Sequence, residues 1–457
     1  MADNLDVFVA LQTKLYDPNG NGAGQGAQVI QAEGYFFRYR PATDDWIQSA
    51  AVLLGDPDED WLSKGQHPNC ERPDVIASGN TFLVSWTRRY RISAENAPAV
   101  LEVATCWWDP SGNGSLVVVN GGLPRGRGFP LDSNYLVRDC SGVADTVLLH
   151  TSADQITAGV VYPAQTEFSS TSDGNRTFEI RIASFTLDTS TATPTLSTEG
   201  PWVLHDDVPF DGELGIESNT PVAGVVLPDA TDTGTNDRFF LAYEDQKRVW
   251  DFGANALLRR GRIHLEVVQA VHAIQPGGAV SVAGWEVTDS HVFGSSTDVL
   301  RRRANLSSFP DADPAGEDHV AIAFGKLDRS AGDDREVVFE HWSAADSGLV
   351  RVDWPNGAGW QNSPTNDDWR SVPLLGTQAP LVARCLAERA VGTTGQIVRY
   401  DVASDTEDVV FSGTKVQRPA VDGVWPGGAE TTIASWEADW TDPNSNTTVA
   451  QVFLLAD

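Results

Sequence analysis

Two segments far apart in this chain repeat the same pattern of residues. RPDVIASGNTFLVSW begins at Arg72, and RPAVDGVWPGGAETTIASW begins at Arg418. Each reads Arg-Pro-x-Val, then a loop that contains glycine, then an alternating strand that ends in Ser-Trp. Similar short runs, joined by turns rich in Gly, Asp, Asn and Pro, fill the rest of the chain, and helical periodicity is nearly absent. The chain is therefore predicted to be all-β and built from repeated antiparallel units.

Repeats of about 50–70 residues, each with three to four antiparallel strands, are typical of a β-propeller. We predict a single propeller over residues 1–457 with seven blades, and six blades is the alternative because the sixth is short. The N-terminal and C-terminal segments both have strand character, so we expect them to pair and close the ring. The expected blades cover approximately residues 1–55, 56–130, 131–210, 211–298, 299–376, 377–414 and 415–457.

Two segments also resemble known propeller elements. In RYRPATDDWIQSA, the residues Tyr39, Pro41, Thr43 and Trp46 resemble the blade element of kelch-type propellers. TSDGNRTF, at residues 171–178, resembles the Asp-box of sialidase-like propellers, which is a hairpin brace and occurs once here. Both resemblances imply the architecture and no particular activity, because propellers host many unrelated functions.

The composition is strongly acidic. Asp and Glu number 63 against 32 Lys and Arg, and the formal net charge is −31. Such a surface repels itself unless ions screen it, so we interpret the chain as adapted to high salt. The charge also argues against binding to nucleic acid. Small basic clusters are interpreted as solvated loops or partners of local acids, with docking onto an acidic neighbour as the alternative: Arg125 and Arg127; Arg259, Arg260 and Arg262; Arg301, Arg302 and Arg303.

The beginning of the sequence, MADNLDVFVALQ, lacks the cationic and apolar segments of a secretory signal. No apolar run is long enough to predict a membrane span. We therefore expect neither a signal peptide nor insertion into a membrane. The four cysteines are too scattered for a disulfide framework. We interpret them as buried thiols, with a Cys70–Cys106 or Cys106–Cys140 bridge as the alternatives.

Two acidic turns are candidate sites for calcium or magnesium. DPNGNG has oxygen ligands at its first, third and fifth positions, followed by Gly, as in the opening of a calcium loop. GDPDEDW gathers three carboxylates. Both sequences also suit ordinary turns, in which Pro fixes φ and Gly or Asn adopts a positive φ. The candidate ligands are Asp17, Asn19, Asn21, Asp56, Asp58 and Asp60, and no other cofactor is predicted.

No catalytic signature is present, since HExxH, GxSxG and phosphate-binding glycine loops are all absent. We therefore predict no catalytic residues and favour a non-enzymatic interaction module: a structural or host-adhesion protein of a virus particle in a high-salt environment. Its expected partners are other virion proteins, or host surface glycans or proteins, in a multi-copy assembly, and its expected location is the virion, with the cytoplasm of a halophile as the alternative.

The alternative function is a carbohydrate-active hydrolase or lyase, or a soluble lectin, that uses the propeller axis. The sequence does not exclude a pair of carboxylates for glycoside hydrolysis, because a propeller assembles its site from loops far apart in sequence. Two close carboxylates lining an axial pocket would favour the enzyme.

Overall fold

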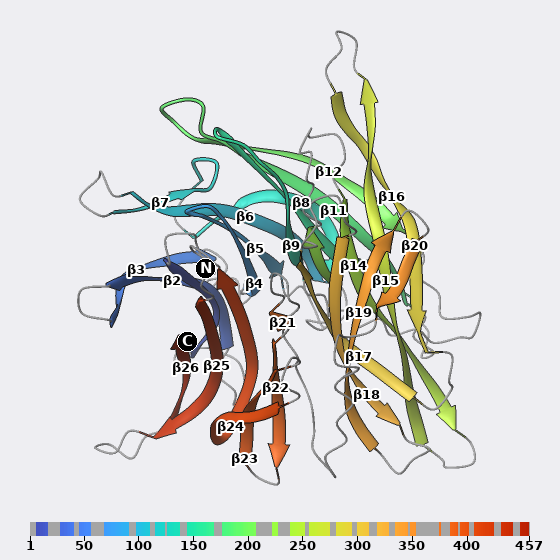
Figure 1. Ribbon diagram of the computed structural model, residues 1–457. Helices are drawn as coiled ribbons and strands as arrows, with labels where there is room; N and C mark the ends of the chain where they lie inside the picture. The colour runs from blue at the N-terminus through green and yellow to red at the C-terminus, as the bar shows by residue number, and fades with distance from the viewer. Residues whose placement is uncertain are drawn as a thin grey trace. The chain divides into compact units, whose positions relative to one another are not determined.

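The computed structural model of the protein (Figure 1) divides into two compact units, Met1–Leu214 and Gly215–Asp457. Its regular structure consists of strands, with no helix among the residues that it describes. These are residues 6–16, 28–40, 45–55, 68–90, 97–109, 115–123, 126–137, 144–168, 176–206, 222–226, 238–251, 256–274, 280–294, 299–309, 318–328, 334–345, 348–352, 374–375, 384–391, 394–401, 406–424, 431–441 and 448–456.

The strands of the first unit are β1 (Val7–Tyr16), β2 (Gln28–Arg40), β3 (Asp45–Gly55), β4 (Pro68–Ser78), β5 (Thr81–Tyr90), β6 (Ala97–Asp109), β7 (Ser115–Val119), β8 (Phe129–Val137), β9 (Asp145–Thr151), β10 (Gln155–Phe168), β11 (Arg176–Asp188) and β12 (Thr195–His205). The strands of the second unit are β13 (Val222–Val226), β14 (Arg238–Asp251), β15 (Ala256–Ile274), β16 (Val280–Phe293), β17 (Val299–Phe309), β18 (Asp318–Asp328), β19 (Asp334–Ala345), β20 (Gly348–Val352), β21 (Leu374–Leu375), β22 (Arg384–Val391), β23 (Thr394–Asp401), β24 (Thr406–Val424), β25 (Thr431–Thr441) and β26 (Thr448–Ala456).

The first unit contains three antiparallel meanders. β1–β3 form a three-stranded sheet, and the strands within β4–β7 and within β9–β12 pair in chain order. Four-stranded meanders of this kind are the repeating element of propellers. The fold is therefore all-β and propeller-like.

β8 links two of these meanders, which independent blades would not require. β7 pairs with only residues 105–109 of β6, and β8 occupies the same edge of β6 at residues 97–103. A single register pair, Gln165 with Leu136, joins β8 to β10. β4–β12 consequently form one nine-stranded sheet.

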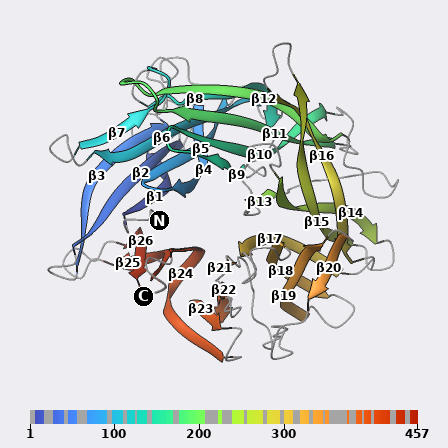
Figure 2. The same ribbon diagram turned by 45° about the horizontal axis from the view of Figure 1, so that its top comes forward.

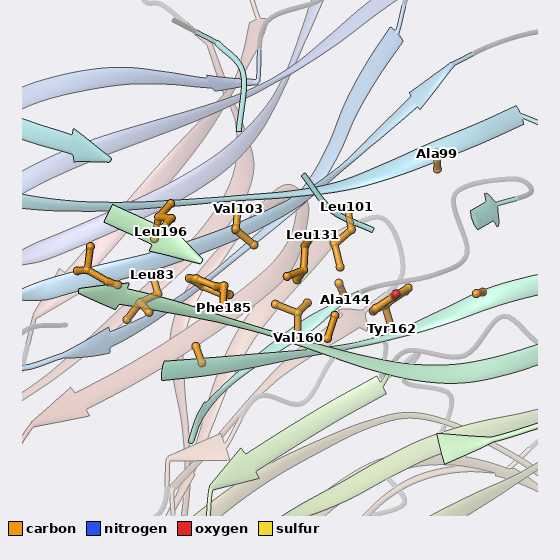
Figure 3. Packing of buried hydrophobic residues seen from close by; sticks show 14 residues of the cluster. Leu83, Ala99, Leu101, Val103, Leu131, Ala144, Val160, Tyr162, Phe185 and Leu196 are labelled. Atoms are coloured by element: carbon orange, nitrogen blue, oxygen red, sulfur yellow. The ribbon is translucent and has the colours of Figure 1, made fainter. Parts of the chain in front are cut away.

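The β4–β7 meander is buried on both faces. Every residue from 82 to 88 on β5 is buried, with Leu83 in the core shared with β9–β12 and Trp86 in the core shared with β1–β3. A run in which every residue is buried, including Ser85, Thr87 and Arg88, indicates a strand covered on both sides. In Figure 3, Leu101 and Val103 of β6 face Val160 and Phe185 of β10 and β11.

The core residues between β4–β8 and β9–β12 include Leu83, Ala99, Leu101, Val103, Leu131, Ala144, Ala158, Val160, Tyr162, Ala164, Ala183, Phe185, Leu187 and Leu196. Those between β1–β3 and β4–β6 are Phe8, Ala32, Phe36, Leu54, Cys70, Phe82, Val84, Trp86, Ala104 and Cys106.

The second unit repeats the meander arrangement (Figure 2). β13–β16 and β17–β20 are four-stranded meanders that share an apolar core, in which Phe293 lies 5.0 Å from Phe324 and 5.6 Å from Trp342 between ring centroids. β24 pairs with two strands along its length. Residues 406–413 pair with β23, and residues 414–424 pair with β25.

The two segments that repeat in sequence also have the same strand register. Asp74 pairs with Ser85, and Ala420 pairs with Ser435. A register shift precedes each pair, at the Arg-Pro dipeptide, where proline cannot donate to the ladder. The Arg-Pro-x-Val motif therefore marks a β-bulge followed by the same cross-strand pairing in both units.

The described residues of the kelch-like segment lie in β2 and β3, where Tyr39 pairs with Trp46, and Pro41 and Thr43 lie outside the described residues. β1 is an edge strand of its three-stranded sheet, and β26 is an edge strand of a six-stranded sheet. Closure of a ring through these strands, and the number of blades, therefore remain predictions.

A buried ion pair lies in the core between β1–β3 and β4–β6. Glu102 accepts hydrogen bonds from Trp86 Nε1 and Arg88 Nε, each at 2.9 Å. Arg88 also donates from Nη2 to the carbonyl of Gly126 at 2.7 Å. The side chains of Arg88 and Glu102 are 0% and 2% exposed, so water does not replace either partner.

We expect Glu102→Ala to lower the free energy of unfolding by about 3–5 kcal/mol, because it leaves the Arg88 guanidinium buried without the carboxylate that pairs with it. Urea denaturation measures this, with Glu199→Ala on exposed β12 as the control that changes little. A loss of less than about 1 kcal/mol for Glu102→Ala would show that the pair is not needed.

Candidate active site

The candidate site lies where β4 and β9 pack side by side. The backbone N–H of Thr146 donates to Asp74 Oδ2 at 2.7 Å, and the hydroxyls of Ser78 and Thr151 lie 2.9 Å apart. Both contacts advance in the same chain direction, so the two strands run parallel. Each is the first strand of a four-stranded meander in the first unit.

Three hydroxyl and amide groups fix the carboxyl of Asp74. It accepts from the backbone and the hydroxyl of Thr146 and from the backbone of Val75. Because the Thr146 hydroxyl donates to Asp74, its oxygen is left to accept from Ser85, whose Oγ is 2.9 Å away. Ser85 is the cross-strand partner of Asp74, so the β4–β5 pairing and the β9 contact hold the same carboxyl.

Asp145, the first residue of β9, is hydrogen-bonded to Asp74 through its side chain. Two ionised carboxylates have no donor between them, so this bond requires a proton on one of the two. Burial raises the pKa of Asp74 above its ordinary 3.8, although the bonds from Thr146, Val75 and Asp145 act in the opposite direction. The raised pKa of Asp74 therefore favours the form of the pair that holds one proton.

A protonated carboxyl beside an ionised one is the combination that general acid–base chemistry needs. Asp74 and Asp145 are both half-buried, so the pair is not sealed in the core. The cluster carries no basic side chain among the partners described above. The pair can give a proton to one atom of a substrate while its other carboxylate acts on a second atom.

A second polar group borders the same core at β8, β10 and β11. Tyr162 donates its hydroxyl to Asp132 at 2.5 Å, and Arg181 lies 3.2 Å from Asp132 and 2.6 Å from Glu179. Burial lowers the pKa of Arg181, but the hydrogen bond and charge of Glu179, with the charges of Tyr162 and Asp132, together raise it. Tyr162 is 1% exposed, so its hydroxyl is not accessible to a substrate. The hydrogen bonds of Tyr162, Asp132 and Arg181 therefore stabilise the core.

The second unit contains a pair of histidines. His319 Nδ1 and His341 Nε2 are 2.8 Å apart, and burial together with the charge of His319 lowers the pKa of His341 to about 4. Among the residues that the structure describes, no group of three His, Cys, Asp or Glu is placed to hold a metal ion.

The candidate metal ligands from the sequence lie outside the described residues. This applies to both turns, and the calcium or magnesium site remains a prediction: Asp17, Asn19, Asn21, Asp56, Asp58 and Asp60. Cys70 and Cys106 are buried thiols that no disulfide joins, and burial raises the pKa of Cys106. Cys140 lies outside the described residues.

None of the described segments forms a helix with the length and apolar character required to cross a membrane.

Sequence reasoning missed both members of the carboxyl pair, although one signal was available. Asp74 occupies the third position of Arg-Pro-x-Val, where the second copy of the repeat has Ala420. A carboxylate that replaces a small apolar residue at the same register position is unexpected for a strand that packs against its neighbour. Aligning the repeats therefore singles out Asp74, whereas Asp145 has no equivalent in the Arg-Pro motif.

No family model matches the chain, and no curated protein matches it. Several solved structures are similar at low identity. A Trypanosoma rangeli sialidase in complex with sialic acid is 11% identical, with a TM-score of 0.39, and the match covers 97% of this chain and 58% of that one. The chain thus spans little more than half the length of that protein.

Two arabinanases are also similar. An exo-1,5-alpha-L-arabinanase from a bovine ruminal metagenomic library is 13% identical over 70% of this chain and 92% of that one, with a TM-score of 0.30. A Cellvibrio cellulosa alpha-L-arabinanase complexed with arabinohexaose is 10% identical over 75% and 94%, with a TM-score of 0.29.

The matched carbohydrate-active enzymes correct one prediction. The chain was expected to be a non-enzymatic structural or host-adhesion protein of a virus particle, and the similar solved structures are a sialidase and arabinanases instead. That interpretation is wrong. It rested on the absence of a contiguous catalytic motif, which does not exclude an enzyme whose carboxyls come from separate strands.

The shared proton predicts a distinct pH dependence of stability. Below the unfolded pKa of Asp74, near 3.8, the contribution of its raised folded pKa is fully present, and it is lost as the pH rises through the folded pKa. Asp74→Asn removes this titration. Relative to the wild type, the variant should therefore gain stability as the pH rises from about 3.8 through the folded pKa of Asp74, as measured by thermal unfolding.

Asp188→Asn is the control of opposite sign. Hydrogen bonds from Ser190 and Gln155 lower the pKa of Asp188, so its contribution is present at neutral pH and is lost as the pH falls. Parallel curves for the wild type and Asp74→Asn would show that the pair holds no extra proton.

Proposed function

We propose that the chain is a carbohydrate-active hydrolase whose acid and base are the carboxyl pair Asp74 and Asp145. The observation that carries the proposal is the hydrogen bond between the two carboxyls, together with the raised pKa of Asp74. Glycoside hydrolases use two carboxyl groups, of which one is protonated and the other ionised at the start of the reaction.

The protonated carboxyl of the pair gives its proton to the glycosidic oxygen as the bond from that oxygen to the anomeric carbon breaks. The ionised carboxylate attacks the anomeric carbon from the other side and forms a glycosyl ester. Water then attacks the same carbon, returns a proton to the first carboxyl and releases the second. The sugar leaves with its original anomeric configuration.

Retention follows from the closeness of the two carboxyls. Inverting enzymes keep theirs roughly 6.5–9.5 Å apart to admit a water molecule, and retaining enzymes keep theirs roughly 5–5.5 Å apart. A hydrogen-bonded pair is nearer to the retaining separation, and its two carboxyls must separate to admit the anomeric carbon between them. The pair therefore suits the nucleophile-and-acid arrangement.

The architecture belongs to the same proposal. The successive meanders support a seven-bladed propeller, with six blades as the alternative, that closes through β1 and β26. In such a ring the first strands of the blades, among them β4 and β9, line the central channel where a sugar chain enters. A cysteine pair introduced into β1 and β26 would form a disulfide only if the ring closes there.

We expect Asp74→Ala and Asp145→Ala each to lower kcat about a hundredfold or more, because each removes one of the two reacting carboxyls. The assay uses 4-methylumbelliferyl glycosides, including α-L-arabinofuranosyl and sialyl substrates, at several NaCl concentrations. Proton NMR of the first product formed reports its anomeric configuration, which should be retained.

Alanine at position 74 is a well-matched substitution, since Ala420 occupies the equivalent register position of the second repeat. Asp188→Ala, on an exposed strand end, is the control that keeps full activity. Unchanged turnover by folded Asp74→Ala, or no hydrolysis of any glycoside by the wild type, would contradict the proposal.

A further inference from the structure

The hairpin of β15 and β16 extends beyond the neighbouring strand of its meander. The ladder between β14 and β15 ends where Arg238 pairs with Gln269, whereas β15 continues to pair with β16 as far as Ile274. In Figure 1 this end of the hairpin rises beyond β14. Among the strands that the structure describes, residues 270–274 and 280–284 therefore pair only with each other, and we call these two segments the arm.

The arm exposes apolar side chains on both of its faces. Val271 is 39% exposed and Ile274 is 80% exposed. Side chains alternate along a strand, so these two point to opposite faces of the hairpin. A partner that covered one face would leave the other exposed, whereas a strand added along the edge of β15 contacts both. The arm is therefore suited to edge-to-edge pairing.

The arm also carries no formal charge. Residues 267–285 contain no Asp, Glu, Lys or Arg, and this is the longest such run in a chain with 63 acids and 32 bases. Exposed strand edges usually carry charges that oppose pairing with another strand. This edge lacks them, so a second strand can approach it without local repulsion.

The charge of the whole chain indicates which partner suits the arm. A basic partner would be attracted to the acidic surface, whereas a partner of the same sign is repelled there and can approach where charge is absent. A second copy of this chain carries the same net charge of −31 and an identical strand edge. Two identical edges can pair antiparallel about a two-fold axis, which closes the assembly at two copies.

We propose that the arm pairs with the arm of a second copy, edge of β15 to edge of β15, in a symmetric dimer. Val271 and Ile274 then lie against uncharged side chains of the other copy on the two faces of the joined sheet. Such an interface is smaller than the roughly 1,200 Å² of a standard one, so we expect association at about 10–100 µM. Neither the carboxyl pair nor catalysis is needed for it.

Salt should strengthen this dimer. The two copies repel each other through their net charges, and added ions screen that repulsion. The affinity should therefore rise with NaCl, whereas a complex with a basic partner would weaken.

Sedimentation-velocity ultracentrifugation tests the proposal on the full chain over about 1–200 µM protein, in about 0.1 M and about 2 M NaCl. The wild type should change from monomer to dimer with concentration, and at lower concentration in the higher salt. Val271→Asp/Ile274→Asp should weaken the dimer about tenfold or more, because like charges then oppose each other along the joined edge. Val350→Asp/Val409→Asp makes the same change in charge at valines that are 45% and 49% exposed on β20 and β24, and should leave the dimer unchanged.

Thermal unfolding of both double variants confirms that each is folded. A wild type that stays monomeric at every concentration and salt, equal weakening by both double variants, or a dimer that dissociates as NaCl is raised would each overturn the inference. Flotation of a monomeric wild type with phosphatidylcholine vesicles would assign the arm to a lipid surface and would also overturn it.

Discussion

Packing of sheet face on sheet face is the interaction on which the first unit depends. A meander of three or four strands cannot bury both of its faces alone, so β4–β7 is stable only with β1–β3 on one side and β9–β12 on the other. The alternating residues of β5 show this most clearly, since Leu83 and Trp86 belong to opposite cores. The side chains between these layers are mainly apolar, and the buried charges described there are paired, Arg88 with Glu102 and Arg181 with Asp132.

The same packing creates the chemistry of the candidate site. β9 lies against β4 because its meander packs on the β4–β7 face, and this brings Asp145 to Asp74. Burial makes a second negative charge costly there, so the pair keeps a proton instead of ionising fully. The hydroxyls of Thr146 and Ser85 then fix the orientation of the Asp74 carboxyl. Burial between the strands thus contributes both to the stability of the layers and to the raised pKa of Asp74.

Local patterns predicted the fold class well, because strand-and-turn composition and the Arg-Pro-x-Val repeat act over short distances. The structure adds that the two copies of the repeat share a register, seen in the equivalent pairs of Asp74 with Ser85 and Ala420 with Ser435. The role of β8 was not predictable, since its pairing with β6 depends on how much of that edge β7 leaves open. The carboxyl pair was not predicted, for a related reason. Asp145 approaches Asp74 through packing between two meanders, and the spacing of residues in the sequence does not reveal this contact. The non-enzymatic prediction rested on the absence of a contiguous motif, and a site assembled from separate strands would have none.

The shared proton of Asp74 and Asp145 is the central claim, and infrared spectroscopy tests it most directly. Difference spectra between the wild type and Asp74→Ala should contain the band of a protonated carboxyl at pH values above 3.8, the ordinary pKa of an aspartate, and this band should disappear as the pH is raised further. A protonated band that disappears at the pH at which an exposed aspartate ionises would contradict the account, because the pKa of Asp74 would then not be raised.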